Sequence, residues 1–412
     1  MGQADRAGEA GATAAAGFDP EAATAALIDS LGAETLAAAA AYTAGNHWIL
    51  VGNTVLAVAI AWFVIRRRWL DRIETRLSGR PTLAALAVAA AYLLAENLIA
   101  LPWTIWTGWW RETQFGRTTQ PFGDWLMQDM LALALTVISG GLFFAALYWL
   151  IRRTGRRWWL WGGGLVAGFT GLLLLLGPVL IEPLFNVYRP LPEGEVRARL
   201  ERQAEAAGVP ADRIFVYDGS RQSENFTANV TGIFGSARIA ISDVALRGAD
   251  LDEVEAVTGH EIGHYVLGHV WWSVALFGGL AVFGFFLADR LFGPAARLLG
   301  ARAALAEPRG LPVLLALLSV LSLLAQPVFN TASRQREREA DLYALQTVNK
   351  PEALARALLK TAVYRDPRPH PWQEALFYTH PSVERRVRMA MEWKAARTAG
   401  AAAPLPAPPA PR

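Results

Sequence analysis

Two of the six histidines in this 412-residue chain flank a single glutamate, in the run HEIGH at residues 260–264. On a helix, side chains four residues apart lie on one face, so His260 and His264 can direct two imidazoles at one metal ion. Glu261 lies beside them, and this is the HExxH pattern of two zinc ligands and a general base. The alternative interpretation is a pair of structural histidines at the start of a membrane helix.

A catalytic zinc site needs a third protein ligand and an open position for water. His269 is the nearest further histidine, but on a continuing helix it points away from the other two. A better candidate lies in SRQREREAD, residues 333–341, where Glu337 and Asp341 share a helical face. Glu337 can bind zinc, and Asp341 can hydrogen-bond a ligand histidine from behind. A charged helix exposed to solvent would explain the same segment by itself.

The elements that must position these residues are membrane helices. Apolar residues make up 53% of the chain and charged residues only 18%, against roughly 25% charged in soluble domains. Runs long enough to cross a bilayer occur at 48–65, 83–106, 131–151, 158–188, 271–288 and 311–329. HEIGH precedes the fifth run and SRQREREAD follows the sixth, so both emerge on the same side of the membrane. There is no cysteine, which excludes thiolate ligands.

Basic residues and the fourth run bear on the orientation. Arginine clusters at 66–80 and 152–157 predict cytoplasmic loops, and the loop 108–124 between them would face outward. The fourth run spans roughly 46 Å as a helix. Gly177-Pro178 should break or kink it, so it is either one tilted span or a short hairpin. The net charge of +3 is spread through loops, which argues against a nucleic-acid partner.

Residues 189–250 form the main soluble stretch. The pattern predicts an amphipathic helix at 193–207 and short strands at 213–217, 228–234 and 237–242. Asp250 can cap a helix that carries HEIGH and continues into the fifth apolar run.

Together these segments resemble the type I CAAX prenyl proteases, which are integral-membrane zinc endopeptidases, and their bacterial relatives. HEIGHYVLGH is similar to the HExGH helix of that family, and SRQREREAD to its SRxxExxAD segment, which places Glu337 at the third zinc ligand. RETQFGRTTQPFGDW (111–125) resembles its outward loop, and PLFNVYRPL (183–191) its entry to the catalytic domain.

Two further segments carry the resemblance. THPSVERR (379–386) resembles the segment whose histidine stabilises the oxyanion, and His380 has an arginine, Arg386, six residues on, whereas His370 has a leucine there. TANVTGIFGSARIAISD (227–243) resembles the edge strand that pairs with an extended substrate, although Thr227 stands where the family usually has asparagine.

The resemblance implies a mainly α fold. It is a polytopic membrane barrel of about seven helices around a water-filled chamber, with a zinc metallopeptidase domain that carries a small β-sheet. Since the sequence shows six runs, the fourth would supply two short helices, and the catalytic segment would then lie on the cytoplasmic side. A single crossing at 158–188 would reverse that placement.

The expected organisation has four parts. Residues 1–45 form an N-terminal segment that is partly disordered, and 46–188 hold the N-terminal membrane helices. The metallopeptidase domain covers 189–395 and includes a membrane hairpin at 271–329. The Pro/Ala-rich tail at 396–412 is expected to be disordered.

The implied function is a CAAX-type zinc endopeptidase with one Zn²⁺ per chain. Its metal ligands are His260, His264 and Glu337, with Asp341 behind them. Glu261 takes a proton from the attacking water and returns it to the leaving amine, and His380 with Arg386 stabilises the oxyanion. The substrate is expected to add as a strand along Asn229, Val230, Thr231 and Gly232.

The expected partners are the lipid bilayer and a membrane-associated peptide or protein, prenylated or not, and the Ala/Arg-rich composition indicates a bacterial inner membrane. The alternative function is a channel or transporter with a structural or regulatory metal site. Glu261 distinguishes the two, because a site that only binds metal needs no carboxylate between its histidines. An inactive relative that acts as a scaffold is disfavoured because every catalytic position is filled.

Overall fold

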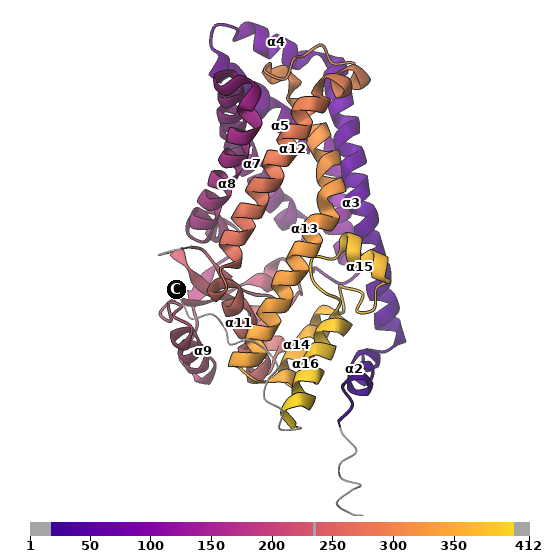
Figure 1. Ribbon diagram of the computed structural model, residues 1–412, viewed down its shortest axis with the longest axis vertical. Helices are drawn as coiled ribbons and strands as arrows, with labels where there is room; N and C mark the ends of the chain where they lie inside the picture. Colours follow the sequence, from indigo (N-terminus) through magenta and orange to yellow (C-terminus); the bar gives the residue numbers. More distant parts are fainter. Residues whose placement is uncertain (1–17, 234–235, 399–412) are drawn as a thin grey trace, which may run out of the picture.

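Long helices dominate the computed structural model, which describes residues 18–233 and 236–398. Six of them stand side by side along the long axis of the molecule (Figure 1). They are α3 (Ala33–Arg67), α5 (Pro81–Ile105), α7 (Phe122–Thr154), α8 (Trp158–Leu176), α12 (His269–Leu299) and α13 (Leu311–Thr347). The outermost parts of the two terminal segments predicted to be disordered, 1–17 and 399–412, lie outside the described residues.

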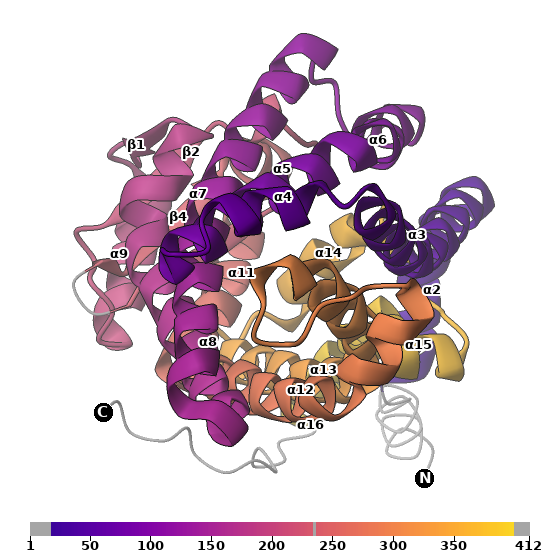
Figure 2. The ribbon, with the colours of Figure 1, turned by 90° about the horizontal axis from the view of Figure 1, so that it is seen from above.

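The six helices form a closed ring. Each contacts the next in chain order, and α13 returns to contact α3, as the view from above shows (Figure 2). Large apolar side chains such as Trp48 and Leu324 are 75% and 70% exposed on the described helices. A soluble protein would not leave so many exposed, whereas lipid is a favourable environment for them. The ring therefore agrees with the predicted membrane barrel.

α7 and α8 are two antiparallel helices joined by a sharp turn. Gly155 has a φ of 53°, a conformation that glycine adopts readily. The rings of Phe143 and Phe169 lie 5.2 Å apart, and a Cβ at Gly162 would be 3.3 Å from Leu147. The chain therefore runs the length of the ring twice, once along α7 and once back along α8. Apart from the turn at Gly155, this stretch is helical up to Leu184.

The fourth apolar run holds one helix. α8 continues into a π-helical turn at Gly177–Ile181 and a 3₁₀ turn at Glu182–Leu184. Gly177 and Pro178 widen the helix there, as π-bulges do, and do not reverse the chain. The prediction of two short helices in this run is therefore wrong. The placement of the catalytic segment on the cytoplasmic side was based on those two helices, so it loses its support.

The connections at the two ends of the ring differ. At one end, α4 (Trp69–Arg76) follows α3, and a 3₁₀ turn, η7 (Pro308–Gly310), precedes α13. Arg309 N donates to Glu74 Oε2 over 2.8 Å, so these connections lie together. At the other end, η1 (Trp106–Trp110) and α6 (Arg111–Gln114) lead to Asp124, which accepts a hydrogen bond from Arg221 Nε over 3.1 Å. That end carries the β-sheet and the helices that pack around it.

A four-stranded sheet lies between α8 and α12 in the chain. Its strands are β1 (Tyr188–Pro190), β2 (Ile214–Tyr217), β3 (Ala228–Thr231) and β4 (Arg238–Ser242), in the order β1-β2-β4-β3. β2 runs parallel to β4, and the other pairs are antiparallel. The three predicted strands are confirmed in slightly shorter form, and β1 was not predicted. β3 lies at the edge, as expected for the substrate-binding strand.

The remaining helices cover the sheet and α13. α9 (Glu195–Ala206), a 3₁₀ turn η5 (Gly219–Arg221), α10 (Asp243–Gly248) and α11 (Leu251–Val266) accompany the sheet, and α2 (Pro20–Asp29), α14 (Pro351–Thr361), α15 (Pro371–Phe377) and α16 (Val383–Thr398) complete the domain. The predicted amphipathic helix is thus confirmed as α9. A buried cluster that includes Ile28, Leu354 and Val387 joins α2, α14 and α16, so the N-terminal helix packs on the C-terminal one.

Candidate active site and metal centre

The HEIGH residues lie in the last two turns of α11, and the helix begins at a well-formed cap. Asp250 accepts a hydrogen bond from Glu253 N over 2.8 Å, and the Glu253 side chain accepts one from Asp250 N over 2.9 Å. This reciprocal pair satisfies backbone donors that the first turn leaves unpaired, and it confirms the predicted cap. His260 and His264 follow on one face, with their Nε2 atoms 3.1 Å apart.

Glycines allow α11 to lie very close to α13. A Cβ at Gly259 would be 2.5 Å from Val348 Cγ2, and one at Gly263 would be 3.1 Å from Tyr343 Cβ. Because glycine has no side chain, the two helix axes can approach at these positions. The close approach brings Glu337 of α13 to the two histidines.

The three side chains form a set of donors suited to zinc. Nε2 of His260 lies 3.3 Å from Glu337 Oε2, and Nε2 of His264 lies 3.4 Å from Glu337 Oε1. Ligands at 2.0–2.1 Å around a tetrahedral ion are separated by about 3.3 Å, so all three separations match. Glu337 Oε2 is buried and has no hydrogen-bond donor among the described residues. The donor set therefore fits one zinc ion and leaves a fourth position for water.

A buried carboxylate contacts the His260 ring at the nitrogen that faces away from the donor set. His260 Nδ1 lies 2.8 Å from Asp341 Oδ1, and the Asp341 side chain is fully buried. Arg386 of α16 donates to both Asp341 oxygens over 2.7 Å. Burial alone would lower the pKa of Arg386, but the ion pair with Asp341 raises it. A carboxylate behind a ligand histidine fixes its ring and tautomer, and Arg386 holds that carboxylate in place.

A third histidine, His269, contacts His264 on the side of the ring away from the donor set. Its Nδ1 lies 2.9 Å from Nδ1 of His264. The helix was predicted to continue from HEIGH into the fifth apolar run, and this prediction is wrong. α11 ends at Val266, and Gly268 takes a φ of 69° before α12 begins. The break turns His269 back toward the site. The signal that sequence reasoning missed is Gly268, because glycine in this conformation ends helices.

His380 approaches Glu337 from the loop between α15 and α16. Its Nε2 lies 3.3 Å from Glu337 Oε2, and its Nδ1 lies 2.9 Å from Thr379 Oγ1. Burial lowers the pKa of His380 to about 3, so the ring is neutral near pH 7 and can donate one hydrogen bond. His370, by contrast, is exposed and caps α15. Of the two His-Pro pairs, the structure brings only the second to the donor set.

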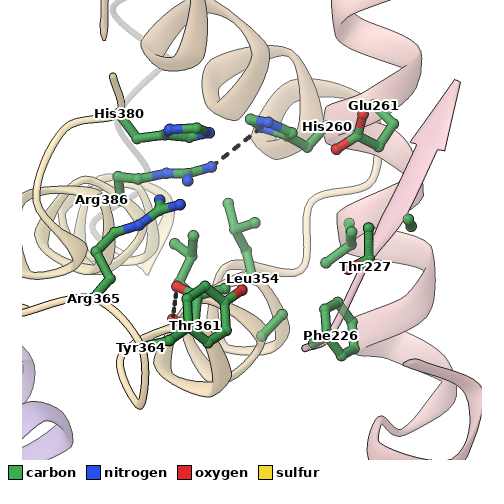
Figure 3. Close-up of a pocket in the computed structure, with 14 residues that line it drawn as sticks. Phe226, Thr227, His260, Glu261, Leu354, Thr361, Tyr364, Arg365, His380 and Arg386 are labelled. Carbon is green, nitrogen blue, oxygen red and sulfur yellow. Dashed lines mark hydrogen bonds between the residues drawn. The ribbon is translucent and has the colours of Figure 1, made fainter. Parts of the chain in front are cut away.

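A cavity of about 250 Å³ opens beside His260 and Glu261. Figure 3 shows Glu261 at its rim, with His380, Arg386 and Arg365 on one side and Thr227 on the other. Burial raises the pKa of Glu261, which brings a general base closer to the working pH. Arg365, on the segment between α14 and α15, is a cavity residue that sequence reasoning missed, since no motif marks it.

The edge strand β3 leads into the same cavity through Thr227 and Ala228. Ile239 N donates to Arg213 O, away from β3. Its partner Val230 therefore belongs to a pair without mutual hydrogen bonds, and its own N–H and C=O point to the open edge. No strand in the described part of the chain pairs with that edge. Asn229 Oδ1 and Thr231 Oγ1 are buried nearby without hydrogen-bond partners among the described residues.

Two family models match this chain. Peptidase family M48 matches residues 190–394, and the CAAX prenyl protease N-terminal model, described as five membrane helices, matches 20–187. An uncharacterized metalloprotease of Bacillus subtilis, YhfN, is 31% identical over 305 residues, which cover 72% of this chain and 71% of that protein. The chain belongs to peptidase family M48. The matches show a zinc metallopeptidase with membrane helices, and His260, His264 and Glu337 form the group of described residues that could hold its zinc.

Two further proteins are similar to this chain. CAAX prenyl protease 1 of Saccharomyces cerevisiae is 27% identical over 317 residues, which cover 71% of this chain and 68% of that protein. The crystal structure of S. mikatae Ste24p has a TM-score of 0.72 at 23% identity, covering 88% of this chain and 90% of that one. The latter similarity shows the fold. The alternative of a channel with a regulatory metal site has no support in these findings.

Proposed function

We propose that this M48 protein is a CAAX-type endopeptidase that cleaves membrane-associated peptides, with prenylated C-terminal peptides among its substrates. The observation that carries this proposal is the position of Glu261, at the rim of a cavity and next to three converging zinc donors. The yeast relative is named a CAAX prenyl protease. The three donors of this chain lie close to its membrane helices, which suits substrates that are bound to the membrane. We further propose that residues 189–395 act as the metallopeptidase domain.

The proposed mechanism divides the work among the zinc ion and three side chains. Zinc, when bound, supplies a Lewis acid that activates a water molecule and polarises the scissile carbonyl. Glu261 accepts the proton of the attacking water and passes it to the leaving amine. His380 donates its Nε2 hydrogen to the developing oxyanion. Arg386 supports His260 through Asp341, and its remaining charge favours the negative transition state.

The substrate is proposed to lie along the open edge of β3. Val230 directs its N–H and C=O outward, and extended peptides bind proteases by adding a strand to such an edge. The side chains of Asn229 and Thr231 offer polar atoms that lack partners in the described residues. Gly232 follows with a φ of 91°, and a Cβ there would be 2.5 Å from Ser236 O. The strand therefore ends at a turn that only glycine permits without strain.

We propose a bacterial plasma membrane as the location, with the catalytic domain on the outer face. Arginines gather at the end of the ring opposite the catalytic domain. They lie in the last turn of α3 and the connection to α5 (Arg66, Arg67, Arg68, Arg72, Arg76 and Arg80), in the last turn of α7 and the turn to α8 (Arg152, Arg153, Arg156 and Arg157), and in the last turn of α12 and the connection to α13 (Arg297, Arg302 and Arg309). Short loops rich in arginine remain on the cytoplasmic side, so the site faces away from the cytoplasm.

The experiment that tests the function measures zinc and turnover on one preparation of Glu261→Gln. Glutamine has nearly the same shape as glutamate, so the helix and the donor set should remain. It cannot accept a proton at neutral pH, and general-base catalysis is typically worth about 10²- to 10⁴-fold. We expect about one zinc per chain and cleavage reduced by that factor. A zinc-loaded Glu261→Gln protein with the wild-type rate would refute the mechanism.

The substrate class needs a separate comparison. A peptide with a farnesylated cysteine three residues from its C-terminus and the same peptide without the lipid should be offered to the wild-type protein. A prenyl-dependent enzyme cleaves the first with the higher kcat/KM. Equal values would indicate a membrane endopeptidase that does not recognise the lipid.

A further inference from the structure

Arg365 borders the catalytic cavity without belonging to the zinc machinery. It lies on the segment between α14 and α15 and lines the cavity beside His260 together with His380 and Arg386. It also lines a second cavity of about 250 Å³, which reaches Asn46 and His47 of α3. Figure 3 shows its guanidinium group directed toward that of Arg386. Arg365 therefore stands where the two cavities meet.

The two arginines differ in their partners. Arg386 forms a bidentate ion pair with Asp341. No ion pair or hydrogen bond of the Arg365 side chain is found among the described residues, and Glu337 is the carboxylate whose charge acts on it from a distance. Burial is the largest influence and lowers the pKa of Arg365, the positive charge of Arg386 lowers it further, and the charge of Glu337 offsets only part of this. A guanidinium group that is partly removed from water and lacks a counter-ion is unfavourable until an anion binds.

Arg365 is held in position by its neighbours. Asp366 N donates to Thr43 Oγ1 on α3 over 2.8 Å, and Asp366 O accepts from the Tyr378 hydroxyl over 3.2 Å. These bonds fix the backbone beside Arg365 between the ring and the loop that carries His380. A binding group held in this way loses little entropy when its ligand arrives.

The wall of the catalytic cavity beside Arg365 is apolar. This wall is formed by Val257 of α11 and by Leu354, Ala357 and Leu358 of α14. The start of β3 also lines the cavity. An extended peptide that follows β3 would place an apolar side chain against this wall. The next group along the peptide would then reach Arg365.

We propose that Arg365 binds a carboxylate of the peptide substrate and makes the enzyme prefer substrates that carry one next to an apolar residue. This inference rests on the proposed peptidase function. The guanidinium fork matches a carboxylate with two parallel hydrogen bonds. The carboxylate is either the C-terminal group of the substrate or an acidic side chain, and both have the same chemistry.

The test compares substrates that differ only in that charge. One peptide is prepared with a free C-terminal carboxylate, with a C-terminal amide, and as the amide with an aspartate in place of an asparagine near its C-terminus. kcat/KM is measured for wild type, Arg365→Gln and Arg365→Lys. The control is Arg368→Gln, on the same segment, because Arg368 pairs with Asp29 at 2.7 Å and Glu384 at 3.0 Å and does not line either cavity.

Wild type should prefer the free acid, or the aspartate peptide, over the neutral amide by about 10- to 100-fold, the range expected for a hydrogen bond to a charged group. Arg365→Gln should lose this preference, because its kcat/KM on the charged peptides should fall by a larger factor than its kcat/KM on the neutral amide. Arg365→Lys should retain part of the preference, and Arg368→Gln all of it. Whichever charged peptide shows the effect identifies the source of the carboxylate.

Two results would overturn the inference. Arg365→Gln could slow the charged and neutral peptides equally, which would indicate a structural or oxyanion role. Wild type could also show no preference for either charged peptide. If wild type cleaves no peptide, the proposed function fails instead, and the inference is then tested by binding. Fluorescent acid and amide peptides are titrated into zinc-loaded Glu261→Gln with and without Arg365→Gln, and equal Kd values would refute it.

Discussion

The two histidines proposed to bind zinc have different partners at Nδ1. His260 rests on Asp341, whereas His264 rests on His269, whose Nε2 lies 3.1 Å from Glu339 Oε2. Since Nε2 of His264 faces the metal position, its Nδ1 carries the hydrogen and donates to Nδ1 of His269. His269 then donates from Nε2 to Glu339. This chain of hydrogen bonds fixes the ring that binds the metal.

His269→Ala should therefore weaken zinc binding without abolishing it. Loss of a partner behind a metal ligand typically costs about 10- to 100-fold in affinity. Competition with a chelator measures the zinc Kd directly. Glu337→Ala is the reference, because it removes a ligand and should leave the site without zinc. An unchanged Kd in His269→Ala would show that His264 needs no support.

His380→Ala tests a role confined to the transition state. The variant should keep its zinc, because His380 is not part of the donor set, and kcat should fall by about 10²-fold or more. Zinc content and steady-state kinetics on the same preparation check this. His370→Ala is the matched control, since His370 only caps α15. Equal losses in the two variants would contradict the choice of His380.

The structure brings the proposed donor residues together, and the sequence could indicate this grouping because spacing on a helix is local information. His260 and His264 are one turn apart, and Glu337 and Asp341 are one turn apart, so each pair shares a face. The role of His269 was not predictable in this way, because it depends on a helix break. Arg365 was not predictable either, because its position depends on contacts with α3 and Tyr378, which are remote in the chain.

At the level of elements, the edge strand offers a sharp test. Val230→Pro removes a backbone N–H that points to the open edge and spares the hydrogen bonds between β3 and β4. KM for peptides should rise while zinc content and thermal stability stay near wild type. Asn229→Pro is the contrasting variant, because Asn229 belongs to a pair bonded to β4, and it should destabilise the sheet. Unaltered kinetics in folded Val230→Pro would refute strand addition.

Helix number and helix ends were harder to predict than helix positions. The six apolar runs correspond to the six long helices because a bilayer-spanning run is a strong compositional signal. Gly177-Pro178 was expected to break or kink a helix and does not end it, whereas Gly268, which was not singled out, does. A π-turn absorbs the first pair within α8, and composition does not distinguish these two outcomes.

At the level of the whole molecule, the orientation can be measured on a background without cysteine. Ser30 is exposed near the catalytic domain, and Ser78 is exposed between α4 and α5 at the other end. In intact spheroplasts, a membrane-impermeant maleimide should label Ser30→Cys and should label Ser78→Cys only after permeabilisation. The reverse pattern would place the catalytic domain in the cytoplasm.

α13 runs for 37 residues from the far end of the ring to Glu337 and beyond, whereas Gly268 separates α11 from its neighbouring span. A bilayer that is too thick or too thin makes its helices tilt. Tilting α13 displaces Glu337 directly, whereas α12 reaches the histidines of α11 only through the break at Gly268 and the contact between His269 and His264. Turnover in vesicles should thus depend on the acyl-chain length of the lipid and peak where hydrophobic mismatch vanishes, so that bilayer thickness itself regulates the enzyme.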